Sequence, residues 1–251
     1  MRRILRAPPI EGGRSRSTPD GLLAVTVNPA HSPSHKYGRH VSRNGRPPEP
    51  VRARLPIAGI LLAPGAGESA DQPAFVAFAD AVAEAGLVVE RMDFPYRLAG
   101  RRRPDPPEVL EAAVRARAAE LAQKLGVTAE QLVLGGRSMG GRICSRVVAA
   151  GLGTGGLVLV SYPLHPPGQP DRLRTAHFPA LGPPCLFVSG TKDAFGTPAE
   201  LESATRAVPG PVTHVWIEGA DHGLRGHVGD AAEAVVHWLG QTFSLVVPGA
   251  R

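Results

Sequence analysis

The chain has 251 residues, of which 43% are hydrophobic and 20% are charged, which is typical of one globular α/β domain of ordinary size with a tail. No apolar run approaches the roughly 20 residues that a membrane-spanning helix needs, so we expect a soluble protein with no membrane partner. The net charge of +6 belongs to residues 1–54, which carry eleven Lys or Arg against three acids. Because the remaining residues are slightly acidic, we expect no nucleic-acid partner.

Residues 1–50 mix Arg, Pro, Ser, Gly and His without apolar periodicity, so we expect a basic, disordered N-terminal segment. The stretch "LLAVTV" at 22–27 is compatible with an added edge strand. The segment lacks the apolar stretch of a secretory signal, while a transit peptide, a mis-assigned start codon and a solvated tail stay open. The folded domain is predicted over 51–245, and a tail over 246–251. The two cysteines form no disulfide framework and favour a cytoplasmic location.

From residue 57 onward, short apolar runs alternate with helical patterns, which predicts an α/β fold with a parallel sheet between helices. Apolar residues spaced three and four apart mark the helices. In the first half of the domain, the pattern predicts strands at 57–63, 87–96 and 131–136, with a helix around 75–82 that Gly86 ends and a helix at 110–125 between them. In the second half, it predicts a helix after Ser138, strands at 156–163, 185–190 and 212–219, and a closing helix around 231–239.

Ser138 lies in a G-x-S-x-G motif, "GRSMG", between a predicted strand and a predicted helix. That position is the one a nucleophile elbow requires, because the strained turn needs small residues two positions before and after the serine. Gly136 and Gly140 meet this demand. A phosphate-binding loop would need a Lys after the glycines, and a dinucleotide-binding loop would need G-x-G-x-x-G in the first βα unit, so neither fits. A simple packing turn stays open for the motif alone.

A serine nucleophile needs a base, and the base needs an acid to orient it. In this kind of fold the two follow the serine in the order acid, then histidine, each just past a strand. Asp193 follows the strand "CLFVSG", and His222 follows the strand "VTHVWIEG". We therefore predict Ser138, Asp193 and His222 as the catalytic residues.

Other side chains compete for these roles. Asp221 is next to the histidine, but neighbouring side chains in an extended loop diverge, which favours Asp193. His214 alternates within the last strand and is more typical of a structural residue, and His227 lies in the following turn. His165 also lies at a strand end, where we expect it to line the pocket.

The tetrahedral intermediate of acyl transfer needs two N–H donors. One should be the backbone N–H of Met139, directly after the nucleophile, and the other should come from the loop after the early strand. The glycine-rich turn "LLAPGAGE" supplies that loop. We predict the N–H of Ala66 as the second donor, with Gly67 as the alternative.

With these residues in place, the chain resembles the α/β-hydrolase superfamily, and more narrowly the Tex30 and KANSL3-like α/β-hydrolase domains near the dienelactone hydrolase-like group. The stretches that carry the resemblance are "LLAPGAGE", "RMDFPY", "GGRSMGGR", "YPLHPPGQPDRLR", "FVSGTKDAFG" and "GADHGL". The resemblance implies an α/β-hydrolase fold with a mostly parallel central sheet of about 6 to 8 strands, helices on both faces and the triad at the carboxyl edge of the sheet. One relative in this branch is a subunit of a chromatin complex, so a non-catalytic scaffold that keeps the fold is a second interpretation.

Only the Pro-rich residues 163–184 separate two predicted strands at the point where many such hydrolases insert a lid. This length leaves no room for a cap domain, so we expect a small or narrow pocket. Its predicted walls, besides Met139, are Tyr96, Tyr162, Leu164 and His165. A loop with four arginines also follows a strand on the catalytic side, and it either attracts an anionic substrate group or forms a solvated surface: Arg97, Arg101, Arg102 and Arg103.

The sequence therefore predicts a serine-dependent acyl hydrolase of the carboxylesterase or thioesterase type, acting on a small ester or thioester. Acyl transfer or perhydrolysis at the same triad stays open, as does a protein partner. No histidine spacing suggests a metal site, and we expect no cofactor. Arg137, the neighbour of the serine, needs an acidic partner that the sequence does not identify.

Overall fold

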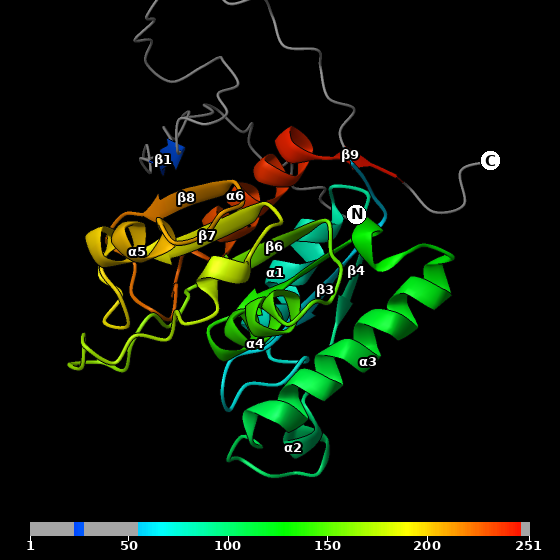
Figure 1. Ribbon diagram of the computed structural model, residues 1–251, viewed down its shortest axis with the longest axis horizontal. Coiled ribbons are helices and arrows are strands. Elements are labelled where there is room, and N and C mark those ends of the chain that lie inside the picture. The colour runs from blue at the N-terminus through cyan, green and yellow to red at the C-terminus, as the bar shows by residue number, and fades with distance from the viewer. Residues whose placement is uncertain (1–22, 28–54, 247–251) are drawn as a thin grey trace, which may run out of the picture.

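The computed structural model describes residues 23–27 and 55–246, and a seven-stranded sheet forms its centre (Figure 1). The strands are Leu23–Val27 (β1), Gly59–Ala63 (β3), Val88–Arg91 (β4), Leu132–Arg137 (β5), Gly156–Val160 (β6), Cys185–Gly190 (β7) and Val212–Ile217 (β8). Their order in the sheet is β1-β8-β7-β6-β5-β3-β4. All neighbours run parallel except β1, which is antiparallel to β8.

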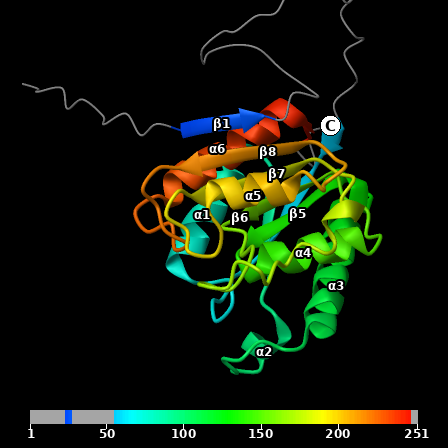
Figure 2. The ribbon, with the colours of Figure 1, turned by 60° about the vertical axis from the view of Figure 1, so that its left-hand side comes forward.

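Helices cover both faces of the sheet (Figure 2). Helices α1 (Pro73–Ala83) and α6 (Val228–Thr242) pack together on one face. The opposite face is covered by α3 (Pro107–Leu125), α4 (Met139–Ala149) and α5 (Pro198–Thr205). Three short turns complete the helices: α2 (Pro95–Leu98), η1 (Ala129–Gln131) and η2 (Phe178–Ala180).

The central strands are apolar at successive positions because both of their faces are buried. In β3, Ile60 and Leu62 pack toward α1 and α6, while Leu61 and Ala63 pack toward α3 and α4. All five residues of β3 are buried. The continuous apolar runs of the sequence therefore predicted an α/β sheet with helices on both faces, and the structure confirms that fold class.

Two predicted strands are shorter than the apolar pattern suggested. The run 57–63 divides at Ala58, because β2 (Pro56–Ile57) pairs with β9 (Ser244–Leu245) in a separate two-stranded sheet. The run 87–96 leaves the sheet after Arg91, and Pro95 begins the short helix α2. Proline fixes a helical φ at a first helical position and restricts the residue before it to extended backbone, which explains this ending.

Helix α5 was not predicted, although the sequence carries a signal for it. Thr197 and Glu200 form a capping box, in which the Thr197 Oγ1 accepts the Glu200 N–H at 3.4 Å and the Glu200 carboxylate accepts the Thr197 N–H at 2.8 Å. Pro198 occupies the first helical position between them. The "TPAE" pattern is therefore a helix start that a search for apolar periodicity overlooks.

The segment that connects β6 to β7 contains only the three residues of η2 as helix, so no cap domain is inserted at this point of the described chain. The edge strand expected within 22–27 is confirmed as β1. The remaining residues of the predicted N-terminal segment and most of the predicted tail lie outside the described residues. No helix in 55–246 combines the length and apolarity needed to cross a membrane.

The topology brings four loops to one edge of the sheet. Strands β3, β5, β7 and β8 are parallel, so the loops that follow their carboxyl ends lie along the same edge. In open α/β sheets, ligands bind at this edge. These loops contain every residue that the sequence predicted for catalysis.

Candidate active site

Ser138 occupies the sharp turn between β5 and α4, where its backbone angles are φ 50° and ψ −116°. A positive φ is costly for a residue with a side chain and persists only where its surroundings hold it. The Ser138 N–H donates to the Val160 carbonyl at 2.8 Å, and the Ser138 carbonyl accepts the Arg142 N–H at 3.1 Å. Hydrogen bonds to the next strand and to the first turn of α4 therefore maintain the strained conformation.

The glycines around the serine are required by close backbone approach. A Cβ atom on Gly136 would lie 2.0 Å from the Ala63 carbonyl oxygen, and one on Gly140 would lie 2.1 Å from the same atom. Gly136 also has φ +154°. Both glycines allow the turn to pack against the end of β3, which is the steric demand that the motif predicted.

Replacing Gly140 by alanine is therefore expected to lower the free energy of unfolding by about 3 kcal/mol or more, because two backbone segments would have to separate. Urea unfolding measures the loss. Gly229→Ala is the matched control, since Gly229 lies in α6 with nothing within 4 Å of its added Cβ. That control should be neutral or stabilising by up to about 1 kcal/mol. Equal stability of the two variants would contradict the steric argument.

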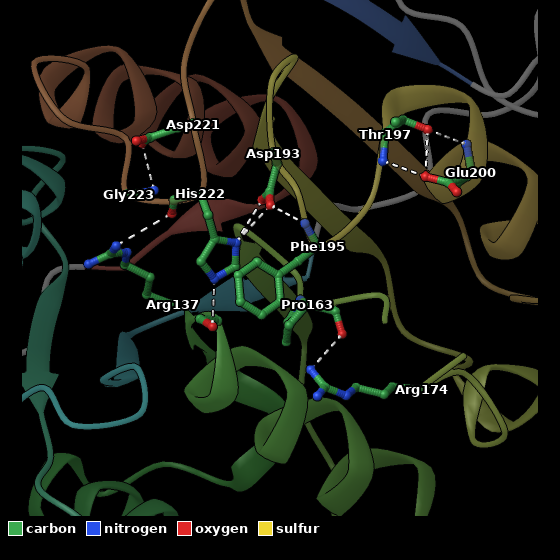
Figure 3. A network of polar contacts seen from close by, with 11 residues as sticks. Arg137, Pro163, Arg174, Asp193, Phe195, Thr197, Glu200, Asp221, His222 and Gly223 are labelled. Atoms are coloured by element: carbon green, nitrogen blue, oxygen red, sulfur yellow. Dashed lines mark hydrogen bonds and ion pairs between the residues drawn. The ribbon is translucent and has the colours of Figure 1, made fainter. Parts of the chain in front are cut away.

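The structure brings Ser138, His222 and Asp193 together in one chain of hydrogen bonds (Figure 3). The Ser138 Oγ lies 2.9 Å from the His222 Nε2. The His222 Nδ1 lies 2.9 and 2.8 Å from the two carboxylate oxygens of Asp193. Because a carboxylate only accepts, Nδ1 carries the proton and Nε2 is left to accept the serine hydroxyl proton.

Burial and stacking hold the histidine in this position. The Asp193 side chain is 1% exposed and the His222 side chain 20% exposed. The ring of Phe195 stacks on the imidazole with centroids 4.0 Å apart, and the Phe195 N–H donates to Asp193 Oδ1 at 2.8 Å. The carboxylate therefore has a fixed backbone donor as well as the histidine, and its orientation is determined by both.

The competing acid and bases lie elsewhere. Asp221 is exposed and accepts the Gly223 N–H of its own loop at 2.8 Å. His214 is buried in β8 between Phe187 and Trp216, and burial lowers its pKa to about 4, which makes it a neutral structural residue. The third candidate, His227, is paired with Asp230 at 2.8 Å at the start of α6.

A pocket of about 420 Å³ opens beside the serine. Ser138, Met139 and His222 line it together with Ala66. Met139 is the first residue of α4, so its N–H has no acceptor within the helix. Both predicted donors of the oxyanion site therefore border the same pocket as Ser138.

The loop after β3 holds Ala66 between two anchored glycines. The Gly65 N–H donates to Glu68 Oε2 at 2.9 Å, and the Gly67 N–H donates to the Tyr96 hydroxyl at 3.1 Å. The Ala66 N–H meets no acceptor among the described residues. Since the N–H of Gly67 is already engaged, the geometry favours Ala66 over Gly67 as the second donor.

Arg137 finds its partner in Glu68, with which it forms an ion pair. The arginine also donates from Nη2 to the His222 carbonyl at 3.4 Å (Figure 3). One side chain next to Ser138 thus connects the loop after β3 with the loop after β8. The sequence could not identify this acid because 69 residues separate the two side chains.

The four side chains predicted as additional pocket walls do not line the pocket, and this prediction is corrected. Tyr96 and Leu164 are fully buried, and Tyr162 packs in the core against Phe178 with its hydroxyl donating to the Arg174 carbonyl at 2.7 Å. His165 is buried with its Nδ1 2.8 Å from the Pro166 carbonyl. Large apolar and aromatic side chains gain more from burial in the core than from an open pocket, which the position in the sequence did not reveal.

Other residues take their place, and the sequence prediction missed them. The pocket is lined by Pro163, Phe195, Arg142 and Arg174 in addition to the residues above. Arg142 follows Ser138 by four residues on α4, and this spacing is the signal that could have placed it on the pocket side.

None of the four arginines of the 97–103 loop lines this pocket. Arg101 pairs with Asp105 at 2.5 Å, and its side chain is 53% exposed. The solvated-surface interpretation of this loop is therefore favoured. No group of three or more side chains suited to hold a metal ion occurs within the described residues.

Comparison with known proteins agrees with this architecture. A family model described as the alpha/beta hydrolase domain matches residues 56–238. Similar solved structures include an α/β serine hydrolase homologue from Coxiella burnetii, with 21% identity, a TM-score of 0.61 and coverage of 76% of this chain and 88% of that chain. An α/β serine hydrolase without a lid from Xanthomonas campestris has 22% identity, a TM-score of 0.61 and coverage of 79% and 88%.

Dienelactone hydrolase from Anabaena variabilis is a third similar structure, with 19% identity, a TM-score of 0.59 and coverage of 76% of this chain and 90% of that chain. At these identities the likeness to solved structures concerns the fold. The family model adds a match over most of the chain, from β2 into α6. The chain therefore belongs to the alpha/beta hydrolase domain family.

Proposed function

We propose that this protein is a serine hydrolase that cleaves a small carboxylic ester or thioester through an acyl-enzyme. The observation that carries the proposal is the continuous chain of hydrogen bonds from Ser138 through His222 to Asp193, at the mouth of an open pocket. Membership of the hydrolase family supports it. The absence of a cap over the described sheet edge favours small or protruding substrates over long buried acyl chains.

In the proposed reaction, the Ser138 Oγ attacks the carbonyl carbon while its proton passes to the His222 Nε2. The carbonyl oxygen becomes negative and accepts hydrogen bonds from the N–H groups of Ala66 and Met139. When the tetrahedral intermediate collapses, the leaving alkoxide or thiolate takes the proton from His222 and the acyl group stays on the serine. Water then repeats the sequence, which releases the carboxylic acid and restores the hydroxyl.

Each residue has a distinct role in this proposal. Asp193 holds the imidazole in the tautomer that can accept a proton and stabilises the imidazolium when it forms. The strained turn presents Ser138 at the start of α4, where the first amides of the helix point toward developing negative charge. We also propose, from the sequence, a cytoplasmic location, a domain over 51–245 and the narrower relationship to the Tex30 and KANSL3-like domains.

Reaction with a fluorophosphonate probe tests the proposal, because an activated serine displaces fluoride and forms a stable phosphonate ester. The full chain should be labelled once, with the adduct mapped to Ser138 by peptide mass spectrometry, and heat-denatured protein should not be labelled. A panel of short acyl esters and thioesters should then be hydrolysed, and product analysis separates hydrolysis from acyl transfer to an added alcohol. A folded protein that is neither labelled nor active on the panel would make the non-catalytic scaffold the better account.

A further inference from the structure

Two arginines line the pocket beside Ser138 and have no carboxylate partner among residues 55–246. Arg142 lies one helical turn after Ser138 along α4, and Arg174 comes from the connection between β6 and β7. Within the described residues, neither guanidinium forms an ion pair. The Arg142 Nε is buried and has no hydrogen-bond partner there. Arg174 makes one long side-chain bond, from Nη1 to the Pro163 carbonyl at 3.4 Å (Figure 3).

Neighbouring arginines are neutralised in the ordinary way. Arg137, the third arginine of the pocket, pairs with Glu68. Arg146 lies one turn after Arg142 on α4 and pairs with Glu111 at 2.6 Å. Of the three arginines that line the pocket, Arg142 and Arg174 are thus the two that no carboxylate of the described residues neutralises.

Leaving these groups unpaired is unfavourable. A charged side chain that loses water without gaining a partner costs free energy, and proteins usually pair such groups. Burial is the largest influence on the pKa of both Arg142 and Arg174, and it lowers each below the usual value. Among the described residues, the one acidic side chain that lines the pocket is Glu68, whose carboxylate already binds Arg137 and the Gly65 N–H.

We propose that Arg142 and Arg174 bind an anionic group, in the simplest case a carboxylate, of the ester or thioester that Ser138 cleaves. The inference rests on the proposed function, whose substrate class it names. Two guanidinium groups that line one pocket can donate to the two oxygens of a carboxylate. The carboxylate would supply an acceptor for Arg142, whose Nε has none among the described residues, and a better one for Arg174 than its single long bond to Pro163. In this proposal, the anionic group of the substrate binds in the same pocket as the scissile carbonyl. It belongs to either the acyl part or the alcohol part of the ester.

Two matched pairs of esters distinguish these positions. Monoethyl succinate against ethyl butyrate places the carboxylate in the acyl part, and acetoxyacetate against isobutyl acetate places it in the alcohol part. The measured quantity is the ratio of kcat/KM for the charged ester to kcat/KM for the neutral ester. Each hydrolysis rate is measured from the acid that is released, by titration at constant pH. Comparing this ratio between variants cancels the intrinsic reactivity of each ester.

In one of the two ester pairs, this ratio should be at least about tenfold higher for the wild type than for Arg142→Gln or Arg174→Gln. A decrease of this size is expected when a charge-assisted hydrogen bond is lost. Arg172→Gln is the matched control. Arg172 is exposed, donates to Gln169 at 2.6 Å and does not line the pocket, so the wild-type ratio should persist. A ratio that both pocket variants leave unchanged, in both pairs, would overturn the proposal.

Failure of the proposed function gives a different result, because no ester would be cleaved and no phosphonate adduct would form on Ser138. Anion binding is then decided by calorimetric titration of succinate into the full chain. Binding to the wild type and to Arg172→Gln that is lost in Arg142→Gln and Arg174→Gln supports the anion site. No binding to the wild type rejects it. Circular dichroism of each variant establishes that it is folded.

Discussion

Replacing Ser138 by alanine is expected to lower kcat on a short ester by a factor on the order of 10⁶, the loss found when a hydrolase of this mechanism loses its nucleophile. The only atom removed is the Oγ, which lies 2.9 Å from His222. The backbone strain at φ 50° is the same for alanine, so the fold should be retained. Turnover of 4-nitrophenyl acetate at saturating substrate, corrected for its spontaneous hydrolysis, measures the loss.

Ser161→Ala provides an unusually close control. Ser161 also follows a strand of the sheet, has φ 49° and is buried, and its Oγ has no hydrogen-bond partner within the described residues. Its replacement should leave kcat within about twofold, since a hydroxyl group without a hydrogen-bond partner contributes little. If Ser138→Ala kept turnover within tenfold of the wild type, the nucleophile would have to be another residue.

Replacing Asp193 by asparagine is expected to lower kcat by a factor on the order of 10⁴, through the wrong tautomer of the histidine. The Phe195 N–H is a fixed donor to Asp193 Oδ1, so the asparagine oxygen would take that place. Its NH₂ group would then face the His222 Nδ1 and donate to it. The imidazole proton would move to Nε2, where it would block acceptance of the Ser138 proton.

The matched control is Asp221→Asn. Asp221 is exposed and accepts the Gly223 N–H through one oxygen, which an asparagine can also do. Its kcat should stay within about twofold of the wild type. A loss on Asp221→Asn as large as that on Asp193→Asn would show that the acid was assigned to the wrong loop. Thermal unfolding of both variants separates a loss of activity from a loss of fold.

Much of the architecture was predictable because buried parallel strands and amphipathic helices leave strong apolar periodicity. The helix predicted at 110–125 and the strand predicted at 185–190 match α3 and β7 closely. Glycines at fixed offsets around Ser138 indicated the elbow, since steric clearance at a sharp turn depends on local sequence. Where a proline interrupted the pattern, as at Pro95, the apolar run was longer than the strand that the structure contains.

The sequence by itself determined the α/β fold, the elbow at Ser138 and the order in which an acid and a histidine follow it. The tertiary structure decided which side chains meet: Glu68 as the partner of Arg137, and the pocket positions of Arg142 and Arg174. Periodicity reports which positions are buried, because burial repeats with the secondary structure. Contacts between loops depend instead on strand order and register, which set distances between residues far apart in the chain and leave no local pattern.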